Sequence, residues 1–303
     1  MRLIHKLILF VGALALSSPA LAVDGVIEIN QAKALAGGVT PSDTPGFPVT
    51  IDQAGSYRLT GNLMVSNANE SGIELTSGFS PVTLDLNGFE VVGPTSCTGI
   101  GSAISCTPLG SGVGIEGLPG RGNFAKIRNG TVRGFPDGGV AVSAWSELDG
   151  LLVTSNGQTG IKVDGGSQVR NCQSIRNGGA GLDGGPANVL THNVIFENGS
   201  TGISPETSSL IAFNTVYRNG LNGVNGCNAC NVVENTIYLN EGDGVDFTVG
   251  HGLVRGNTVI DNAGRQLDLN GSVGYRENVI NGVQTVNNGA DLGGNLCNLG
   301  SCP

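Results

Sequence analysis

The sequence predicts an all-β fold in which the chain winds into a coil of stacked parallel strands, a parallel β-helix. The phrases "NVIFENGSTGI", "NTVYRNGLNGV" and "NTIYLNEGDGV" begin 21 residues apart, at Asn193, Asn214 and Asn235. Each unit holds three short apolar segments separated by Gly, Asn or Ser, which leaves no room for an ordinary helix. Glycine is abundant, at 51 of 303 residues, but lacks the three-residue period of collagen. A period in this range indicates a solenoid.

The apolar positions of successive units fall into columns. Stacking each short strand on its counterpart one unit later gives rungs that rise by ~4.8 Å, with the alternating apolar residues inside. A Gly-plus-apolar pair defines the first strand of most rungs, and its apolar residue recurs at Val140, Ile161, Leu182, Ile203, Val224 and Val245. Leu267 continues this column 22 residues later, after Gln266. A second-strand column runs through Leu148, Val169, Leu190, Ile211, Val232 and Val254.

Two columns of asparagine occupy the turns between strands. The first contains Asn193, Asn214, Asn235 and Asn257, and the second contains Asn156, Asn177, Asn198, Asn219, Asn240 and Asn262. Asparagine tolerates left-handed backbone and bonds locally, and stacked amides form ladders, so we expect structural rather than catalytic roles. Cys172 falls in the first of these columns, where we expect a small buried residue and not a nucleophile.

The chain divides into four segments. Residues 1–22 read as a secretory signal, because Arg2 and Lys6 precede a short apolar run and an Ala-Leu-Ala site. That run is too short to span a bilayer, although an uncleaved anchor is the alternative. We expect an N-terminal cap at 23–66, the β-helix at 67–287 with an insertion at Pro94–Ser111, and a tail at 288–303. The product is predicted to be secreted or periplasmic, with no membrane span after cleavage.

The net charge limits the classes of partner, and the cysteine spacing predicts disulfides. Removing residues 1–22 leaves 13 basic against 24 acidic residues, a formal charge of −11. This balance disfavours nucleic acid and tight binding of polyanionic sugars. Local cysteine pairs in an exported chain predict disulfides, Cys97 with Cys106 and Cys297 with Cys302. Cys227 and Cys230 form a third pair or, as an isolated CxxC, a redox or zinc motif. No cofactor or metal site is predicted, and calcium has no supporting motif.

The rungs "GIKVDGGSQVRNCQSIRNG" and "GVDFTVGHGLVRGNTVIDN" resemble right-handed parallel β-helix proteins of the pectate-lyase-like superfold. The phrases "VTLDLNGF" and "IRNGTVRGF" are similar to the opening rungs of secreted bacterial members. The resemblance covers residues ~67–285 and implies a right-handed coil. Lyases, hydrolases, epimerases, tailspikes and adhesins share this fold, so it does not fix the activity. It implies that a substrate would lie along the outer face of the first-strand column.

Carboxylates on that outer face are the sharpest candidates for catalysis. The outward positions are Glu74, Gly114, Ala141, Lys162, Asp183, Ser204, Asn225, Asp246 and Asp268. Asp246 and Asp268 lie one rung apart, roughly 5 Å, which would raise one pKa and suits a retaining glycosidase pair. The alternative is that polar residues simply cover an exposed strand face.

Carbohydrate binding has its own candidates. Phe196, Tyr217 and Tyr238 follow one column, and an outward aromatic stripe would offer ring faces to sugars. Lateral packing is the alternative for these rings and for Trp145, the only tryptophan, which lies in a first-to-second strand connection. Lys162 and Asp183 are candidates on the first strand, with inter-rung ion pairing as their alternative.

Two functions therefore remain open. The first is a secreted, monomeric β-helix that binds a polysaccharide or cell-surface glycan, or serves as a display rod, without a clear catalytic signature. The second is a polysaccharide-active enzyme, a glycoside hydrolase or polysaccharide lyase, that uses Asp246 and Asp268. A groove flanked by the Pro94–Ser111 insertion, with carboxylates converging in it, would favour the enzyme. A smooth acidic rod with its aromatics packed would favour display.

Overall fold

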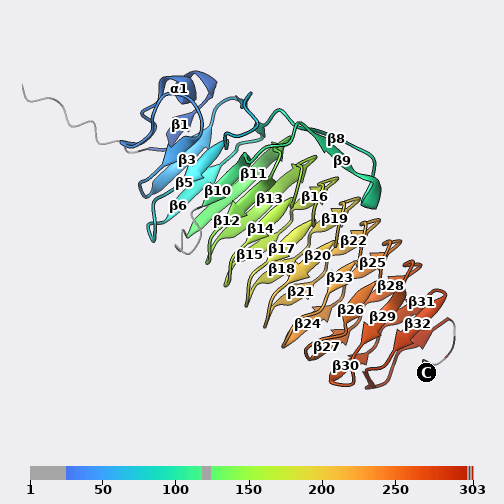
Figure 1. Cartoon of the computed structure of the whole chain (residues 1–303). Coiled ribbons are helices and arrows are strands. Elements are labelled where there is room, and N and C mark those ends of the chain that lie inside the picture. The colour runs from blue at the N-terminus through green and yellow to red at the C-terminus, as the bar shows by residue number, and fades with distance from the viewer. Residues whose placement is uncertain (1–24, 118–123, 299, 301, 303) are drawn as a thin grey trace, which may run out of the picture.

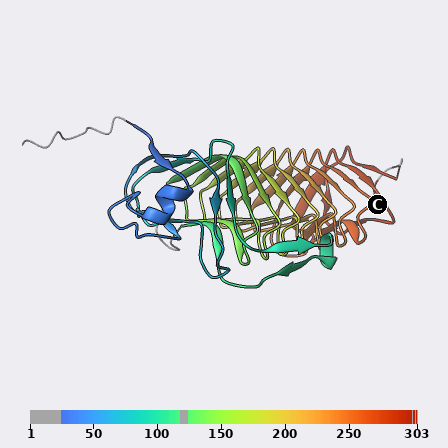
Figure 2. The ribbon, with the colours of Figure 1, turned by 90° about the horizontal axis from the view of Figure 1, so that it is seen from above.

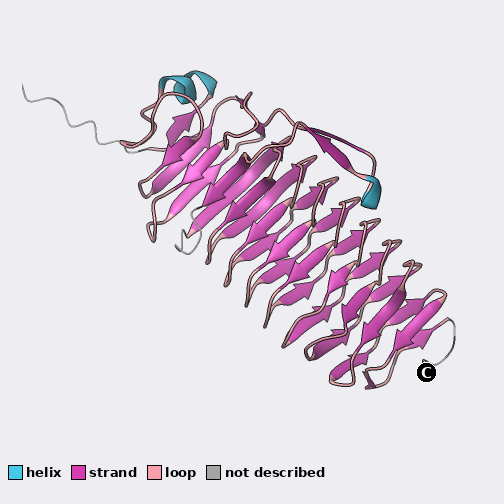
Figure 3. Ribbon diagram, viewed as in Figure 1, coloured by secondary structure: helices cyan, strands magenta, loops and turns pink. Residues whose placement is uncertain are grey.

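The computed structural model describes residues 25–117, 124–298, 300 and 302, so the predicted signal at 1–22 lies outside the described residues. The chain winds into an elongated coil of parallel strands (Figures 1 and 3). The first strands of the rungs pair into one sheet, here called sheet 1. Among the described residues it comprises β2 (Val49–Ile51), β5 (Ile73–Leu75), β10 (Val113–Gly117), β12 (Gly138–Val142), β14 (Ile161–Val163), β17 (Leu182–Gly184), β20 (Ile203–Pro205), β23 (Val224–Asn225), β26 (Val245–Phe247), β29 (Arg265–Leu269) and β32 (Gln284–Asn287).

The second and third strands of the rungs form a larger sheet, here called sheet 2. Its second strands are β1 (Ile27–Ile29), β3 (Gly55–Leu59), β6 (Val82–Asp85), β11 (Ala125–Arg133), β13 (Glu147–Thr154), β15 (Gln168–Arg170), β18 (Val189–Thr191), β21 (Leu210–Ala212), β24 (Cys230–Val233), β27 (Gly252–Arg255), β30 (Val273–Arg276) and β33 (Ala290–Asp291). Its third strands are β4 (Leu63–Met64), β7 (Glu90–Val92), β16 (Gln173–Ile175), β19 (Val194–Phe196), β22 (Thr215–Tyr217), β25 (Thr236–Tyr238), β28 (Thr258–Ile260), β31 (Val279–Asn281) and β34 (Leu296–Cys297). The long β11 and β13 supply both positions in their rungs.

The predicted register is confirmed. Ile161 pairs with Leu182, and Leu182 pairs with Ile203, each one rung further along sheet 1. All three side chains are fully buried. The core is therefore a set of apolar columns that run along the coil, as the three-strand, 21-residue pattern predicts.

Buried amide ladders join the rungs at two turns. In the second asparagine column, the Nδ2 of Asn177 donates to the Oδ1 of Asn198 at 3.0 Å, and the Nδ2 of Asn198 donates to Asn219 at 2.9 Å. The Oδ1 of Asn198 also accepts the backbone N–H of Asn177, one rung before, at 3.1 Å. The first column repeats this pattern, and the backbone N–H of Cys172 donates to Asn193 at 3.0 Å. These contacts satisfy buried polar groups that would otherwise be costly.

The left-handed backbone expected of these asparagines belongs instead to the residue before each one. Glu197 precedes Asn198 and has φ 55°, and His192 precedes Asn193 and has φ 58°. This arrangement turns the chain sharply and aims the asparagine side chain into the coil, where its amide reaches the neighbouring rung. The short amide of asparagine fits that interior position.

Both ends of the coil contain more strand than the segment boundaries imply. In the predicted cap at 23–66, the helix α1 (Gln31–Ala36) lies at the end of the coil, and Asn30 caps its N-terminus. The same segment also supplies β1 and β2, which already pair in parallel with β3 and β5. The tail at 288–303 adds β33 and β34 to sheet 2. These strands escape the sequence pattern because the 21-residue period does not extend to either end.

The predicted insertion Pro94–Ser111 forms an antiparallel hairpin that runs along the coil. Its strands are β8 (Ser96–Thr98) and β9 (Ser105–Thr107), with a short 3₁₀ turn at Gly101–Ala103. Figure 2 shows the hairpin alongside the rungs. Near its base, the Cys97 sulfur lies 3.7 Å from the carbonyl oxygen of Asn156, and at its tip Ser102 N–H donates to Glu241 at 3.3 Å. The hairpin thus follows the turns that precede the strands of sheet 1.

All three predicted cysteine pairs form disulfides within the described residues: Cys97 with Cys106, Cys227 with Cys230, and Cys297 with Cys302. The CxxC motif is therefore a bridge here and not an open dithiol. Cys172 is buried, as expected, and burial raises the pKa of its thiol to about 11. Among the described residues, the helices are too short and too polar to cross a bilayer.

Candidate functional site

The outer face of sheet 1 carries a single column of side chains, and its register corrects one sequence assignment. Glu74 pairs with Glu116, and Glu116 pairs with Ala141, so Glu116 occupies the position that the sequence analysis gives to Gly114. Insertions interrupt the rungs before residue 138, so the sequence period does not fix the register there, and the observed position lies two residues after the predicted one. Beyond that point the column is as predicted, because Lys162 pairs with Asp183, and Asp246 pairs with Asp268.

Two hollows meet in this column where a small side chain stands between large ones. Ala141 lies between Glu116 and Lys162, and Ala141 and Lys162 line both hollows. A hollow of ≈ 330 Å³ lies at the start of the strands and is lined by Val113, Asp137, Gly138, Val140, Ala141, Gln158, Thr159 and Lys162. A second of ≈ 310 Å³ lies at their end and is lined by Gly117, Ala141, Val142, Ser143, Lys162 and Asp164. Each lies within the volume range of small-molecule sites.

Lys162 is the central cation of this groove. Its side chain is 60% exposed, and its Nζ lies 3.7 Å from the Oδ2 of Asp183. That pair is long and solvated, so it contributes little to stability. The ammonium is therefore accessible to a ligand in either hollow. The hairpin base contacts Asn156, two residues before Gln158, so the hairpin flanks the groove on the side of the strand starts.

The groove is acidic on the N-terminal side of Ala141. Burial is the main cause of a raised pKa at Glu116, and the charges of Glu74 and Asp137 raise it further. A hydrogen bond from the Ser71 hydroxyl, 3.0 Å from the Glu116 Oε1, acts in the opposite direction. Glu116 therefore retains its proton to a higher pH than an ordinary glutamate, beside an accessible hollow.

Asp246 and Asp268 lie one rung apart, as predicted, but other groups of the protein already occupy their oxygens. Asp246 accepts from Asn222 Nδ2 at 3.1 Å and from the Thr248 N–H at 2.9 Å. Asp268 is 8% exposed and accepts from Asn287 at 2.7 Å and from Arg265 at 3.2 Å. These contacts fix both carboxylates.

A third carboxylate, which the sequence analysis does not single out, completes this C-terminal cluster. Asp243 accepts from the backbone N–H of Arg265 at 2.6 Å. Burial is the main cause of its raised pKa, to which the charges of Asp268 and Asp246 also contribute. A carboxyl with a raised pKa beside other carboxyl groups is an arrangement that general acid catalysis can use. Asp243 precedes β26 in a turn, so its place beside the strand residues cannot be read from strand alternation.

The aromatic stripe is a stack of rings that cover one another. The ring centroids of Phe196 and Tyr217 lie 4.7 Å apart and those of Tyr217 and Tyr238 lie 4.8 Å apart, with 5° between the planes in each pair. Both faces of the Tyr217 ring are therefore in contact with its neighbours. A sugar ring would meet only ring edges in the middle of this stack, so the geometry favours the packing alternative.

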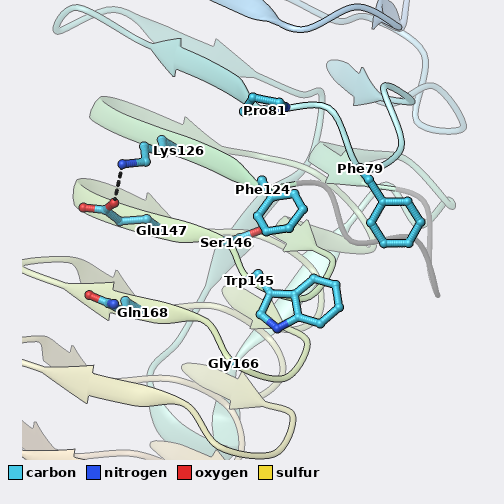
Figure 4. A pocket seen from close by; sticks show the side chains of 9 residues that line it. All are labelled: Phe79, Pro81, Phe124, Lys126, Trp145, Ser146, Glu147, Gly166 and Gln168. Carbon is cyan, nitrogen blue, oxygen red and sulfur yellow. Dashed lines mark ion pairs between the residues drawn. The ribbon is translucent and has the colours of Figure 1, made fainter.

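A different set of aromatics has open faces. Phe79, Phe124 and Trp145 are 65%, 41% and 53% exposed and line a pocket of ≈ 450 Å³ on the turn that follows sheet 1 (Figure 4). The sequence predicts Trp145 in this turn but does not predict the pocket. The signal available was that large aromatics stand in consecutive rungs where later rungs have small residues.

Within the described residues, no group of three or more His, Cys, Asp and Glu side chains is arranged to hold a metal ion. The carboxylates of the C-terminal cluster accept hydrogen bonds from the side chains of Asn222, Asn287 and Arg265 and from backbone N–H groups. This face offers hydrogen-bonding and ion-pairing groups, and it carries two carboxyl groups, Glu116 and Asp243, whose pKa is raised.

Comparison with known proteins identifies the family. Residues 111–295, more than half of the chain, match the family described as right handed beta helix region, and the chain belongs to it. No curated protein matches the sequence.

Solved structures are similar at a distance. A pectate lyase, Pel9A, has 15% identity over 82% of this chain and 67% of its own, with a TM-score of 0.48. The periplasmic alginate epimerase AlgG has 15% identity over 78% and 64%, with a TM-score of 0.45. The enzymatically active domain of tailspike protein 2 of bacteriophage CBA120 has 15% identity over 82% and 40%, with a TM-score of 0.47. The chain spans about two thirds of the first two structures and less of the third.

Proposed function

We propose that this protein is exported and binds a polysaccharide in the groove of sheet 1, with Lys162 at its centre. The observation that carries the proposal is the pair of adjoining hollows that share Ala141 and Lys162. Their lining combines aliphatic groups with donors and acceptors such as Gln158 and Thr159. Sugars present both C–H faces and hydroxyls, so such a lining suits them. Two hollows in sequence along the strands suit consecutive residues of one glycan chain.

Export is supported by the signal-like N-terminal segment and by the three disulfides, which persist in oxidising compartments. The chain carries a formal net charge of −9 over all residues. The accessible lysine of the groove, Lys162, therefore places a positive charge on a predominantly acidic protein. The proposed protein is a monomer whose long side meets the glycan.

The test is retention of the purified protein by a panel of polysaccharides in affinity electrophoresis. Lys162→Ala should weaken retention by about tenfold, since a hydrogen bond to a charged group contributes ~1.5–3 kcal/mol. Lys33→Ala is the matched control, because it removes the same charge from α1 at the end of the coil. Equal retention of the Lys162→Ala and Lys33→Ala variants, or no retention of the wild type by any polysaccharide, would contradict the proposal.

A second candidate function is cleavage of the glycan at the C-terminal cluster. The observation that favours it is the raised pKa of Asp243 beside Asp246 and Asp268. Here Asp243 would act as the acid and Asp246 as the base or nucleophile. Incubation with the same panel should then release reducing ends, or unsaturated products that absorb in the ultraviolet, and Asp243→Asn should abolish the release. Unchanged polysaccharides after prolonged incubation would eliminate this candidate while leaving binding intact.

A further inference from the structure

The turn between sheet 1 and sheet 2 contains a column of residues with left-handed backbone, and its occupants change along the coil. Two aromatics stand in adjacent rungs, Phe124 with φ 41° and Trp145 with φ 60°. Four small residues hold the same place in the next four rungs with nearly the same backbone. They are Gly166 with φ 71°, Ala187 with φ 59°, Ser208 with φ 61° and Ala229 with φ 60°.

The occupants of this turn show whether its backbone requires a large side chain. A bulky residue with positive φ is an uncommon and strained choice. Small residues form the same turn in the following rungs, so the coil does not require an aromatic side chain there. Positive φ alone does not single out this turn, since Phe213 has φ 58° on a different turn. What distinguishes Phe124 and Trp145 is the open pocket that they line.

The two rings form one wall with an open face. Phe124 and Trp145 stack with centroids 5.5 Å apart and 17° between their planes. Phe79 lies 6.4 Å from Trp145, tilted by 38°, so its ring forms a second wall at an angle to the first. Figure 4 shows the three rings around the pocket mouth. Unlike the Phe196–Tyr217–Tyr238 stack, no ring in this set lies between two others.

Gly166 lets the indole lie across the next rung. A Cβ at this position would stand 2.7 Å from Trp145 Cδ1, which is closer than real Cβ contacts, and 3.0 Å from Nε1. The glycine therefore accommodates Trp145 flat against the coil, with its outer face exposed to solvent.

The rim of the pocket is polar without net charge. Lys126 Nζ lies 3.2 Å from Glu147 Oε2, and Gln168 adds an amide one rung further along (Figure 4). Both charged side chains remain partly exposed, at 64% and 27%. Glu147 also pairs with Arg170 through its Oε1. Such a rim offers donors and acceptors together, which matches hydroxyls that do both, and its charges are paired within the protein.

We propose that Phe79, Phe124 and Trp145 form a binding site for a neutral pyranose ring. The C–H face of the sugar lies on the aromatic wall, and its hydroxyls bond to Lys126, Glu147 and Gln168. This inference does not depend on the sheet 1 groove, because the pocket lies beyond the turn and shares no lining residue with either hollow. A pocket of ≈ 450 Å³ is the size of a small-molecule site, far smaller than a stable protein interface.

The experiment uses the fluorescence of Trp145, which is the only tryptophan in the chain and therefore reports on this pocket alone. The probes are cellohexaose and mannohexaose as neutral oligosaccharides and hexagalacturonate as an anionic one. A neutral probe should change the emission saturably, and Phe124→Ala should weaken that binding by about tenfold. Hexagalacturonate should bind more weakly than the neutral probe.

Phe213→Ala is the matched control. Phe213 is 53% exposed like Trp145, has φ 58°, and stacks on another ring, that of His192, at 5.1 Å, but it lies on a different turn. This variant should bind as the wild type does. Lys162→Ala should also leave the emission change intact, so failure of the groove proposal and failure of this one give different results.

Stability distinguishes a ligand site from a structural one. Trp145→Gly should keep Tm within about 3 °C of the wild type, because loss of ring contacts is offset by relief of the left-handed backbone. It should weaken retention of the neutral probe that changes the emission, by at least as much as Phe124→Ala does. The proposal is overturned if neither neutral probe changes the emission, or if Phe124→Ala binds as tightly as the wild type. Tighter binding of hexagalacturonate overturns the neutral class. An emission change that follows protein concentration without sugar assigns the pocket to self-association instead.

Discussion

The interior and the outer face of this coil follow opposite rules. Inside, Asn177, Asn198 and Asn219 repeat one side chain and one set of bonds from rung to rung. Outside, the column on sheet 1 changes from Glu116 to Ala141 to Lys162 over three adjacent rungs. The difference teaches that repetition supplies stability, whereas departures from it create hollows, charges and exposed rings. A site on this protein is therefore found where the repeat fails on the surface.

The largest expected effect comes from breaking the repetition inside. Asn198→Ala removes an amide that accepts two donors from Asn177 and donates to Asn219 and to the Ser174 carbonyl. Several buried polar groups then lose partners, at ~1–3 kcal/mol each, so we expect a loss of at least about 3 kcal/mol. Urea denaturation followed by circular dichroism measures it.

The control for that substitution is Asn231→Ala, which changes the same residue type at an exposed position of β24. It should alter stability by less than about 0.5 kcal/mol. Equal losses of stability in the two variants would show that a ladder asparagine contributes no more to stability than an exposed one.

A smaller and local effect is expected at the hairpin. Replacing Cys97 and Cys106 together by serine opens a short loop whose closure stabilises the hairpin by about 2–3 kcal/mol. The hairpin lies outside the coil, so amide hydrogen exchange should rise in residues 96–107 while the rungs remain protected. Faster exchange throughout sheet 1 would show that the hairpin clamps the coil.

The smallest expected effect concerns pH. Burial raises the pKa of Asp243 in the folded state above its value in the unfolded chain. The unfolded chain therefore loses this proton first as pH rises, and stability falls between the ordinary aspartate pKa and the raised one. Asp243→Asn should remove this fall and stabilise the protein at pH 7 by less than about 1 kcal/mol, since its Oδ1 still accepts from Arg265. Thermal melts of both proteins from pH 3 to pH 7 would show it, and parallel curves would contradict it.

The same contrast explains how far the sequence could be interpreted. The fold, the stacking of Ile161 on Leu182 and the amide ladders follow from the period. Each buried side chain packs on a side chain of the same type, apolar or asparagine, one rung further along. Glu116 was missed because no period holds before residue 138, so the register could not be extended there. The hollows beside Lys162 depend on how neighbouring side chains of different size pack together, and the sequence period does not specify this. The aromatic pocket joins Phe79, from an irregular rung, to Trp145.

The candidate site residues divide along this line. Lys162 and Asp183 lie where the period places them, and the groove gives Lys162 a setting that the sequence does not reveal. Asp246 and Asp268 are also neighbours, but their internal bonds to Asn222, Arg265 and Asn287 depend on turn geometry. Side chains in turns set the local chemistry, and turns vary most between rungs.

Calorimetric titration of one retained polysaccharide into three proteins tests the central claim most directly. The proteins are the wild type, Lys162→Ala and Asp246→Ala. If departures from the repeat near Ala141 form the site, Lys162→Ala should bind about tenfold more weakly, and Asp246→Ala should bind within about twofold of the wild type. Loss of binding in Asp246→Ala with none in Lys162→Ala would contradict the account and move the site to the C-terminal carboxylates.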